Sequence, residues 1–372
     1  MANPVVLSDN FSSYMKERFQ DILRLGMEMG ASDIFLKADH PPVFRVGSAF
    51  KPSSLPAPKD NELKDVLSQM VSPGALAQYQ ADRDLDFSLA IPGMNRFRVS
   101  VFQQRQAIAM VLRPIPSIIP TVESIQLPKP ILEATNHGSG LFLVCGKTDS
   151  GKSTTIAAIL EWFNHHRESR IITLENPIEF VFKDIKCDFI QREYRRDFSS
   201  FSEALNSSLR QDPDIILVGE MRDLESVELA LKAAETGHLV FSTLNATSSS
   251  SVIDRICSMF AVEIRPFILE QLASTLVCVT TQILLNLADG SNRQIAAREI
   301  LLNTPAISNL IRSGKQDQIS SYLENSKEDG MVSMNADIER LVLKGLVKSD
   351  EARTKSPDPE GLMTRLSRWT NK

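Results

Sequence analysis

The sequence predicts an α/β protein with a mainly parallel sheet, preceded by a small α+β domain and followed by a mainly helical region. Two observations lead to this prediction. Short β-rich segments alternate with helical segments from about residue 130, and a glycine-rich turn joins the first of these strands to the first helix. Such alternation favours a parallel sheet covered by helices on both faces, which binds ligands at the carboxyl ends of its strands.

Length and charge limit the classes of function. The chain has 372 residues, enough for two or three domains. Its net charge is −5, and aromatic residues make up only 6% of it. A basic field and stacking platforms for bases are therefore not expected, which argues against a nucleic-acid partner.

The cysteines and the apolar segments indicate a cytoplasmic protein. The four cysteines are isolated from one another, and Cys145 and Cys278 lie in apolar runs where buried, free thiols are expected. That usage is typical of a reducing compartment. Apolar runs stay short of the roughly 20 residues of a membrane span, so any membrane association is expected to come through a partner.

The first part of the chain, residues 1–113, is expected to form the small α+β domain, beginning with a short polar arm over residues 1–12. Apolar residues between Phe19 and Met27 recur at helical spacing, and Gly30 is a candidate helix end. The signals that follow predict a strand over 32–38, a turn at Pro41-Pro42, a strand over 41–46, a loop over 51–60, and two strands within 96–115 joined near Gln104–Gln106.

Three further regions are expected after this domain: a proline-rich linker over 114–128, a core over 129–290 and a mainly helical region over 291–372. The predicted core strands are 141–146, 170–175, 214–220 and 238–244, and the helices between them are 152–166, 199–211 and 223–236. After residue 250 the predicted helices are 250–260, 263–284, 304–313, 330–345 and 358–369, with a turn and a strand within 287–302.

The stretch "GKTDSGKS", residues 146–153, has the spacing G-x-x-x-x-G-K-[ST] of a phosphate-binding loop. A chance glycine-rich turn is disfavoured because an apolar strand precedes it and a helix follows. Backbone N–H groups would face the phosphates of ATP, Lys152 would reach the β- and γ-phosphates, and Ser153 would hold Mg²⁺. The residues expected to contact the nucleotide are Gly146, Lys147, Thr148, Asp149, Ser150, Gly151, Lys152, Ser153 and Thr154.

Asp149 is the unusual residue of this loop, because it brings a carboxylate near the expected polyphosphate. Aspartate restricts the backbone more than glycine does, although it tolerates the left-handed region better than most residues. If the side chain points to solvent, screening keeps the electrostatic penalty modest. If it points inward, nucleotide affinity could fall tenfold or more.

Two further strand ends supply carboxylates. Glu220 follows the apolar strand of "DIILVGE", where it can polarise the attacking water or position Mg²⁺. Glu175 and Glu179 lie in "TLENPIEF", after another predicted strand, and could serve the metal or the water. The alternatives are a surface glutamate at a strand end and an ordinary acidic turn.

His238 and the arginines of the first domain each have two interpretations. His238 stands at a predicted strand start, where a lone histidine is more often structural than catalytic. Arg96, Arg98, Arg105 and Arg113 are either solvated residues on strand faces or arginine fingers that complete a neighbouring subunit's site.

Together these motifs resemble the PilT/PilU group of type IV pilus retraction ATPases, in the secretion-ATPase superfamily. The resemblance extends from about Asp21 to about Arg353. Its most specific stretches are "GASDIFL", "NRFRVSVFQQR", "LRQDPDIILVGEMRDLESVELALKAAETGHLVFSTL" and "LNTPAISNLIRSGK".

The resemblance implies a PAS-like amino-terminal domain and a RecA-like P-loop core. It implies a homohexameric ring, or a mixed ring with a PilT-like paralogue, that acts on the pilus platform protein at the cytoplasmic face of the inner membrane. By the same resemblance, Glu220 is the Walker B glutamate, Glu175 belongs to the Asp box and His238 to the His box. Arg98, Arg105 and Arg113 are implied contacts to the neighbouring subunit's nucleotide.

The chain departs from the family pattern at the nucleotide site. The family usually has glycine at Asp149, aspartate at Asn176 and histidine at Asn245, and it differs again near the carboxyl end at Ser308 and Ser313. Lys152, Ser153, Glu175 and Glu220 fit the pattern. This combination favours ATP binding with weak or partner-dependent hydrolysis.

Three alternatives and one ambiguity stay open. The first is a non-hydrolysing ring component that partners an active paralogue. An assembly or type II secretion ATPase is disfavoured by the isolated cysteines, and a RecA-like nucleic-acid translocase by the charge. The segment 354–372 suggests the PilU-like branch, whereas "EMRDLESVELALKAAETGH" is closer to PilT.

Overall fold

The computed structural model divides the chain into two compact units, residues 1–118 with 177–181 and residues 119–176 with 182–372. The expected polar arm over residues 1–12 lies outside the described part of the chain. The structure describes residues 13–47, 49–115, 118–221, 223–291, 293–325 and 329–370.

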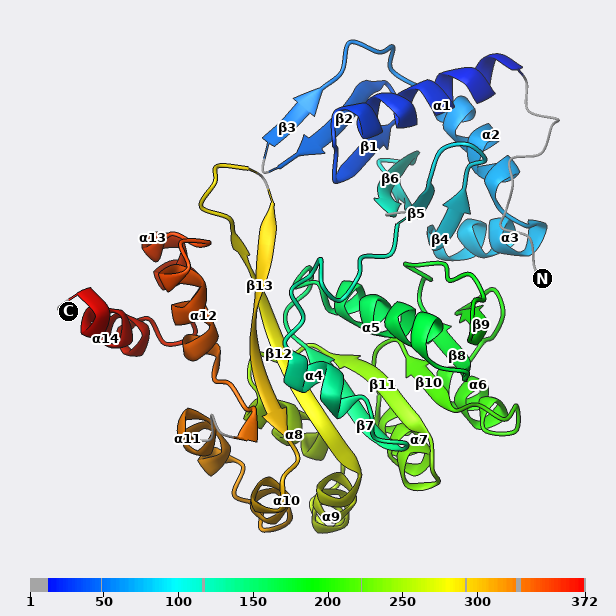
Figure 1. The fold of residues 1–372 in the computed structure, drawn as a ribbon. Coiled ribbons are helices and arrows are strands. Elements are labelled where there is room, and N and C mark those ends of the chain that lie inside the picture. The colour runs from blue at the N-terminus through cyan, green and yellow to red at the C-terminus, as the bar shows by residue number, and fades with distance from the viewer. Residues whose placement is uncertain are drawn as a thin grey trace. The chain divides into compact units, whose positions relative to one another are not determined.

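The amino-terminal unit is built on a six-stranded antiparallel sheet with strand order β3-β2-β1-β6-β5-β4 (Figure 1). Its core includes Leu23, Leu67 and Phe97, from two helices and a strand, so helices and sheet share one apolar core and the α+β prediction is confirmed. The elements are α1 (Ser13–Glu28), β1 (Asp33–Lys37), β2 (His40–Val46), β3 (Ala49–Pro52), α2 (Asp60–Met70), α3 (Pro73–Asp82), β4 (Asp84–Ala90), β5 (Arg96–Gln104) and β6 (Ala107–Ile115).

The predicted turn at Pro41-Pro42 is wrong, because both prolines lie inside β2. The chain reverses before β2, between the paired residues Lys37 and His40, where Asp39 adopts a left-handed conformation with φ of 60°. Proline has no N–H to donate to a neighbouring strand, so it is tolerated mainly where the pairing is irregular. The β1–β2 register shifts between Phe35 and Lys37, opposite the two prolines, which explains why they fit in this strand.

The turn between β5 and β6 is where the sequence predicts it. Gln104 pairs with Ala107, and the two residues between them, Arg105 and Gln106, both have positive φ, 50° and 65°. Two consecutive left-handed residues give the twist that a two-residue hairpin needs. The hairpin therefore presents Arg105 at its exposed tip.

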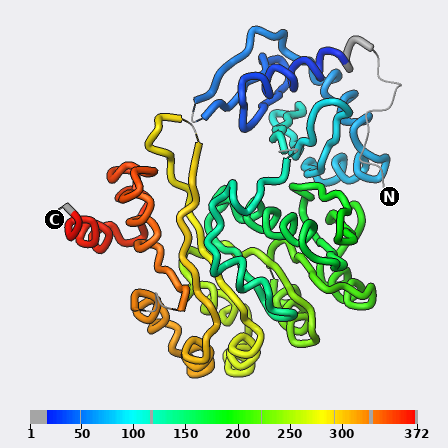
Figure 2. Tube along the Cα trace, in the orientation of Figure 1, coloured from blue at the N-terminus to red at the C-terminus, as the bar shows by residue number. Residues whose placement is uncertain are grey.

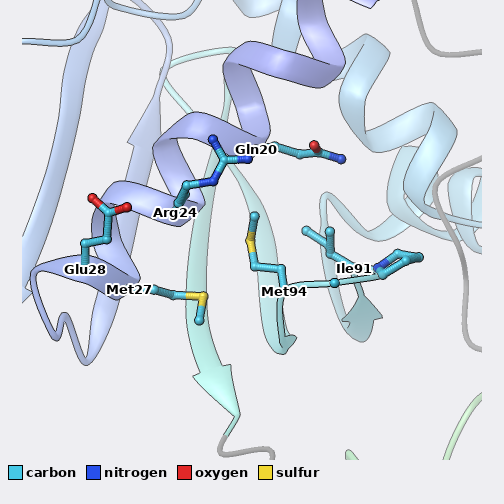
Figure 3. Close-up of a pocket in the computed structure, with 8 residues that line it drawn as sticks. Gln20, Arg24, Met27, Glu28, Ile91 and Met94 are labelled. Atoms are coloured by element: carbon cyan, nitrogen blue, oxygen red, sulfur yellow. The ribbon is translucent and has the colours of Figure 1, made fainter.

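A pocket of about 530 Å³ lies between α1 and the turn that joins β4 to β5. Figure 3 shows Met27 from α1 and Met94 from the turn extending into the space between these elements, with Arg24 and Glu28 nearby. None of the residues expected to contact the nucleotide lines this pocket. It belongs to the amino-terminal unit alone.

The second unit contains a seven-stranded sheet with strand order β13-β12-β7-β11-β10-β8-β9. All neighbours in it are parallel except the antiparallel pair β12–β13. Its elements up to the last parallel strand are α4 (Lys129–Ala134), β7 (Gly140–Cys145), α5 (Lys152–His166), β8 (Arg170–Glu175), β9 (Asp188–Glu193), α6 (Phe201–Ser208), β10 (Ile215–Val218), α7 (Leu224–Glu235), β11 (Leu239–Leu244), α8 (Ser249–Ser258), α9 (Arg265–Thr275) and β12 (Leu276–Asn286).

Helices cover both faces of this sheet, as the alternating pattern predicts (Figure 1). On one face, Leu141 and Leu143 of β7 share a core with Leu231 of α7. On the other, Phe142 of β7 and Phe163 of α5 both lie against the Phe241 ring, at centroid distances of 5.0 and 6.1 Å. Strand β7 is buried at every residue because it is covered twice, which explains its continuous apolar sequence.

The predicted helix over 263–284 is half wrong. Helix α9 ends at Thr275, and residues 276–286 form β12, which pairs with β7 and β13. The run "VCVTTQI" within it is rich in β-branched residues, which prefer strands. The boundary predicted at 290/291 consequently falls inside the β12–β13 hairpin, because β13 (Gln294–Leu302) belongs to the same sheet.

The region after β13 is helical, as expected. Helices α12 and α13 lie beside the β12–β13 hairpin (Figure 2). Leu285 and Ile295 of the hairpin share a small core with Ile338 and Leu362. The elements are α10 (Pro305–Arg312), α11 (Asp317–Asn325), α12 (Met334–Leu343), α13 (Ser349–Lys355) and α14 (Pro359–Thr370).

All four cysteines are free and buried, which confirms the prediction for Cys145 and Cys278. Burial raises the pKa of the Cys145 thiol to about 12 and that of Cys257 to about 11, so both thiols stay protonated at neutral pH. Within the described residues, no helix is both long enough and apolar enough to cross a membrane.

Candidate nucleotide site

Apart from His238, the predicted site residues of the second unit lie at one edge of the sheet. Strands β7, β11, β10 and β8 are consecutive neighbours and run parallel, so their carboxyl ends meet at the same edge. The phosphate-binding loop follows β7, Asn245 follows β11, Glu220 follows β10 and Glu175 ends β8.

The phosphate-binding loop joins buried β7 to α5, which begins at Lys152. Lys152 Nζ donates hydrogen bonds to Gly146 O at 2.9 Å and to Lys147 O at 2.8 Å, so the ammonium group is held directly over the loop. Gly151, before the helix, has φ of 84°. The first N–H groups of α5 lack partners inside the helix and can face an anion, as the sequence predicts.

Asp149 adopts a left-handed backbone conformation, with φ of 62°, and is exposed. Solvent reaches Asp149 and screens its charge. The positive φ explains why glycine suits this position in the family, because a non-glycine residue in the left-handed region costs roughly 1–2 kcal/mol. Aspartate is among the residues that tolerate this conformation better.

Glu220 is positioned by the strands on either side of β10. The amide of Gly219, before it, donates to Leu174 O of β8 at 2.8 Å. On the other side, Thr243 Oγ1 of β11 donates to Gly219 O at 2.6 Å, and the amide of Met221 donates to Thr243 O at 3.3 Å. The backbone on both sides of Glu220 is therefore fixed, which presents its half-buried carboxylate at the sheet edge.

Glu175 is held by hydrogen bonds from two neighbours. Its Oε1 accepts from Thr173 Oγ1 at 2.7 Å and from Gln191 Nε2 of β9 at 3.3 Å. Gly219 packs so closely against this strand end that a Cβ there would lie 3.4 Å from the Glu175 Cα. Glu175 and Glu220 therefore end neighbouring strands, whereas Glu179 falls in the segment that clusters with the amino-terminal unit.

His238 lies at the other end of the sheet. It precedes β11 at the amino end of that strand, where its carbonyl accepts from Gly140 N at 3.0 Å. Its ring Nδ1 lies 3.0 Å from Ala233 O and 3.3 Å from Thr236 Oγ1, which ties it to the end of α7. These contacts match the structural interpretation of a lone histidine, and within this unit the fold does not bring His238 to the loop.

The arginines of the amino-terminal unit form part of a row across its sheet. Arg98 and Arg113 are direct cross-strand partners on β5 and β6. Arg113 Nε lies 2.9 Å from Asp33 Oδ1, and Arg45 Nε lies 3.8 Å from the other oxygen of the same carboxylate. Asp33 is only 5% exposed, so this carboxylate offsets the repulsion between arginines on one face.

This ion pair gives Arg113 a role in stability that Arg105, at the hairpin tip, does not share. We expect Arg113→Gln to lower the opening free energy of β1 and β6 by roughly 1–2 kcal/mol, because Asp33 loses a charged partner. Hydrogen exchange of the β1 and β6 amides would measure this, with Arg105→Gln as the matched control. Equal exchange in the two variants would show that the Asp33 pair contributes nothing to stability.

Sequence reasoning missed one residue that reaches the phosphate-binding loop. Gln282, on β12, is 1% exposed and hydrogen-bonds to both Ser150 and Thr155. The misassigned helix over 263–284 concealed it. The available signal was a single amide side chain inside an otherwise apolar, β-branched run.

A strand, a glycine-rich turn ending in Lys-Ser, and a helix, set at the carboxyl edge of a parallel sheet beside two carboxylates, define a P-loop ATPase. The fold class predicted from the sequence, a RecA-like core with an amino-terminal α+β domain, is confirmed. The chain belongs to the type II/IV secretion system protein family, whose model matches residues 18–352.

Comparison with individual proteins gives the same result. The chain is 41% identical over 340 residues to the type IV pilus retraction ATPase PilT of Pseudomonas aeruginosa, covering 91% of this chain and 98% of PilT. It is 33% identical over 334 residues to the type IV pilus ATPase PilU of the same organism, covering 90% of this chain and 87% of PilU. The resemblance to the PilT/PilU group is thus confirmed.

Among solved structures, the crystal structure of the pilus retraction motor PilT with bound ADP matches with a TM-score of 0.84 and 38% identity. The match covers 92% of this chain and 98% of that one. The agreement in fold therefore extends over both units.

Proposed function

We propose that this chain is an ATP-binding subunit of a ring-shaped motor that powers type IV pilus retraction, with hydrolysis that is weak or depends on a partner subunit. The observation that carries the proposal is the complete phosphate-binding loop, with Lys152 held over it, at the sheet edge shared with Glu175 and Glu220. Similarity to PilT over both units supports the pilus assignment. The ring would be a homohexamer, or a mixed ring with a PilT-like paralogue.

The site contains the groups that ATP hydrolysis needs. Backbone N–H groups of the loop and Lys152 would bind the phosphates. Glu220 would accept a hydrogen bond from water and take up its proton as the water oxygen bonds to the γ-phosphorus and the bond to the β,γ-bridging oxygen breaks. The products are ADP and phosphate. Glu175 would orient the water or Glu220 from the next strand end.

The residues at this edge also fit Mg²⁺, which prefers oxygen ligands and keeps several of its waters. Ser153 is half-buried in the first turn of α5, and Glu220 supplies a carboxylate from the neighbouring loop. When bound, Mg²⁺ would neutralise charge on the phosphate oxygens. The described residues hold no cluster of three or more histidine, cysteine or acidic side chains, and a magnesium ion held largely by phosphates and water does not need one.

The motor would act at the cytoplasmic face of the inner membrane through the pilus platform protein. Arg98, Arg105 and Arg113 are the proposed contacts to a neighbouring subunit's nucleotide, and such cations would offset charge that develops on the transferred phosphoryl group. We leave His238 out of the proposed site, because its contacts lie at the amino end of β11.

The second candidate is a non-hydrolysing ring component that partners an active PilT-like ATPase. Asp149, Asn176 and Asn245 favour it, because all three follow strands of this sheet at the site edge and all three are exposed there. Two of the three replace a residue that the family pattern makes charged or titratable with a neutral amide. Loss of such groups would slow hydrolysis more than it weakens binding.

The test is ATP binding and turnover by the purified chain, alone and mixed with a candidate active paralogue. The variant Asp149→Gly, Asn176→Asp, Asn245→His is expected to raise turnover about tenfold or more, since each tenfold step requires only ~1.4 kcal/mol of transition-state stabilisation. Three exposed substitutions elsewhere in the unit, Lys232→Ala, Glu235→Gln and Ser274→Ala, form the matched control.

Each outcome decides between the candidates. Turnover by the unmodified chain as fast as a family member with every motif intact would exclude weakened hydrolysis. Turnover only in the triple variant would favour the structural ring component. A triple variant no faster than the unmodified chain would show that these residues do not limit the rate, and an unmodified chain that binds no ATP would overturn the proposal.

A further inference from the structure

Gln282 is a buried amide in the middle of β12, with 1% of its surface exposed. A buried primary amide is costly unless both its donor and its acceptor find partners. Both do: Nε2 donates to Ser150 O at 2.7 Å, and Oε1 accepts from Thr155 Oγ1 at 3.0 Å. All three residues are buried, so these bonds are shielded from water.

The two partners lie on either side of Gly151, Lys152 and Ser153. Ser150 precedes Gly151 and Lys152 in the loop, and Thr155 lies in the first turn of α5, after Ser153. A single side chain from β12 therefore ties both ends of the turn that presents the lysine and the helix N-terminus. The bond between Nε2 and Ser150 O joins positions 132 residues apart in sequence.

The loop glycines allow this close approach. A Cβ on Gly146 would lie 2.5 Å from the Gln282 carbonyl oxygen and would also collide with Ser150 Oγ. A Cβ on Gly151 would lie 3.2 Å from Gln282 Nε2. Both glycines of the phosphate-binding motif therefore face the same residue of β12, in addition to having positive φ.

The position of Gln282 in the sheet is fixed from both sides. Strand β12 runs parallel to β7, which leads into the loop, with Thr281 opposite Cys145. On its other side Gln282 is paired with Arg298 of β13, a buried residue whose guanidinium donates to the carbonyls of Ile125 and Gln126. The amide is thus presented to the loop by a strand that is rigidly paired along its length.

We propose that Gln282 is a positioning residue for the phosphate-binding loop, holding it in the conformation that accepts a nucleoside diphosphate or triphosphate. The amide would act through Ser150 and Thr155, without contact to the nucleotide. The inference rests on the proposed function in one respect, that the loop binds a nucleotide. The new element is that the affinity of the loop for the nucleotide depends on a side chain of β12.

The first test compares variants in the full chain. Gln282→Leu removes both hydrogen bonds, and we expect ADP affinity to fall about tenfold, the effect of roughly 1.4 kcal/mol. Thr155→Val removes only the second bond and should cause a smaller loss, about two- to threefold. The matched control is Thr280→Val, which changes another buried β12 side chain whose hydroxyl has no partner among the described residues and should leave ADP affinity unchanged.

Gln282→Glu provides a signature that general destabilisation would not show. The introduced carboxyl group can donate to Ser150 O only when protonated, and burial raises the pKa of such a group. The ratio of wild-type to variant ADP affinity should therefore shrink as pH falls from about 9 to about 6. For Gln282→Leu the same ratio should stay constant over that range.

Hydrogen exchange of the amides of Ser150 and Thr155, which donate to Lys147 O and Gly151 O, separates the inference from the proposed function when it is measured without nucleotide. We expect roughly tenfold faster exchange in Gln282→Leu than in Thr280→Val, the kinetic equivalent of ~1.4 kcal/mol in local opening. Unchanged loop exchange together with ADP affinity within twofold of wild type would overturn the role of Gln282. If the wild-type chain binds no ADP, the proposed function fails, and loop exchange alone decides this inference.

Discussion

Replacing Glu220 by glutamine should lower the turnover number for ATP hydrolysis about 100- to 10,000-fold, the range that a positioned general base contributes. Glutamine keeps the length and the hydrogen-bond acceptor of the side chain but cannot take up a proton. The backbone around it is fixed by Leu174 and Thr243, so the variant amide should occupy the same place. Steady-state ATP turnover and equilibrium ATP binding would be measured on the same preparations.

The variant should still bind ATP with nearly wild-type affinity, because the loop and Lys152 are unchanged. Glu228→Gln, an exposed carboxylate on α7, is the matched control and should keep both turnover and binding. If Glu175→Gln is the more damaging variant, the base is the carboxylate at the end of β8. If Glu220→Gln leaves pilus retraction intact in cells, hydrolysis by this chain is dispensable there.

Replacing Lys152 by alanine should weaken ATP binding about 10- to 100-fold, since a hydrogen bond to a charged group contributes roughly 1.5–3 kcal/mol. The ammonium group is already placed over the loop by the carbonyls of Gly146 and Lys147. It therefore needs only a local rearrangement to reach a bound phosphate. Titration with a fluorescent ATP analogue would measure the loss.

Lys232→Ala is the control for this prediction, because it removes one positive charge from an exposed position on α7. It should bind ATP as the wild type does. The two variants should also differ in thermal stability when nucleotide is present. A bound ligand stabilises the folded state in proportion to the logarithm of its concentration relative to Kd, so the shift in Tm should shrink in Lys152→Ala alone. Equal affinity in both variants would exclude Lys152 as a phosphate ligand.

The parallel part of the fold and the edge that carries the site could be predicted from the sequence because the signals there are local. Strand β8 and helix α5 occupy the predicted residues, 170–175 and 152–166. The phosphate-binding loop and Glu220 each follow an apolar strand of a few residues, and Glu175 ends another. The rule that carboxyl ends of parallel strands share an edge then brings them together without knowledge of strand order.

The failures have non-local causes. The sequence through α9 and β12 has apolar residues close enough together to satisfy a helical period, and only pairing with β7 and β13 makes its second half a strand. The ion pair between Arg113 and Asp33 joins residues 80 apart, and it depends on the order of strands in the amino-terminal sheet. Neither the hydrophobic pattern nor the residue propensities of the sequence specify which strands pair.

The partners of Gln282 were beyond prediction for the same reason. The spacing of the phosphate-binding motif fixes what the loop is, but it does not say which strand lies beside β7. Once β12 is known to be that strand, the amide in its centre must find polar partners, and the loop backbone is what it meets. The strand order therefore places Gln282 beside the phosphate-binding loop, where its role can be tested.

The exposure of Asp149, Asn176 and Asn245 has a consequence for which substitutions this chain can accept. Residues at the open ends of strands contribute little to the packing of either sheet face, so they can be exchanged without loss of the fold. The core that supports Glu220 and the loop is built from other side chains, such as Leu174 and Leu244. Substitution at these three positions can therefore leave the packing of the sheet intact.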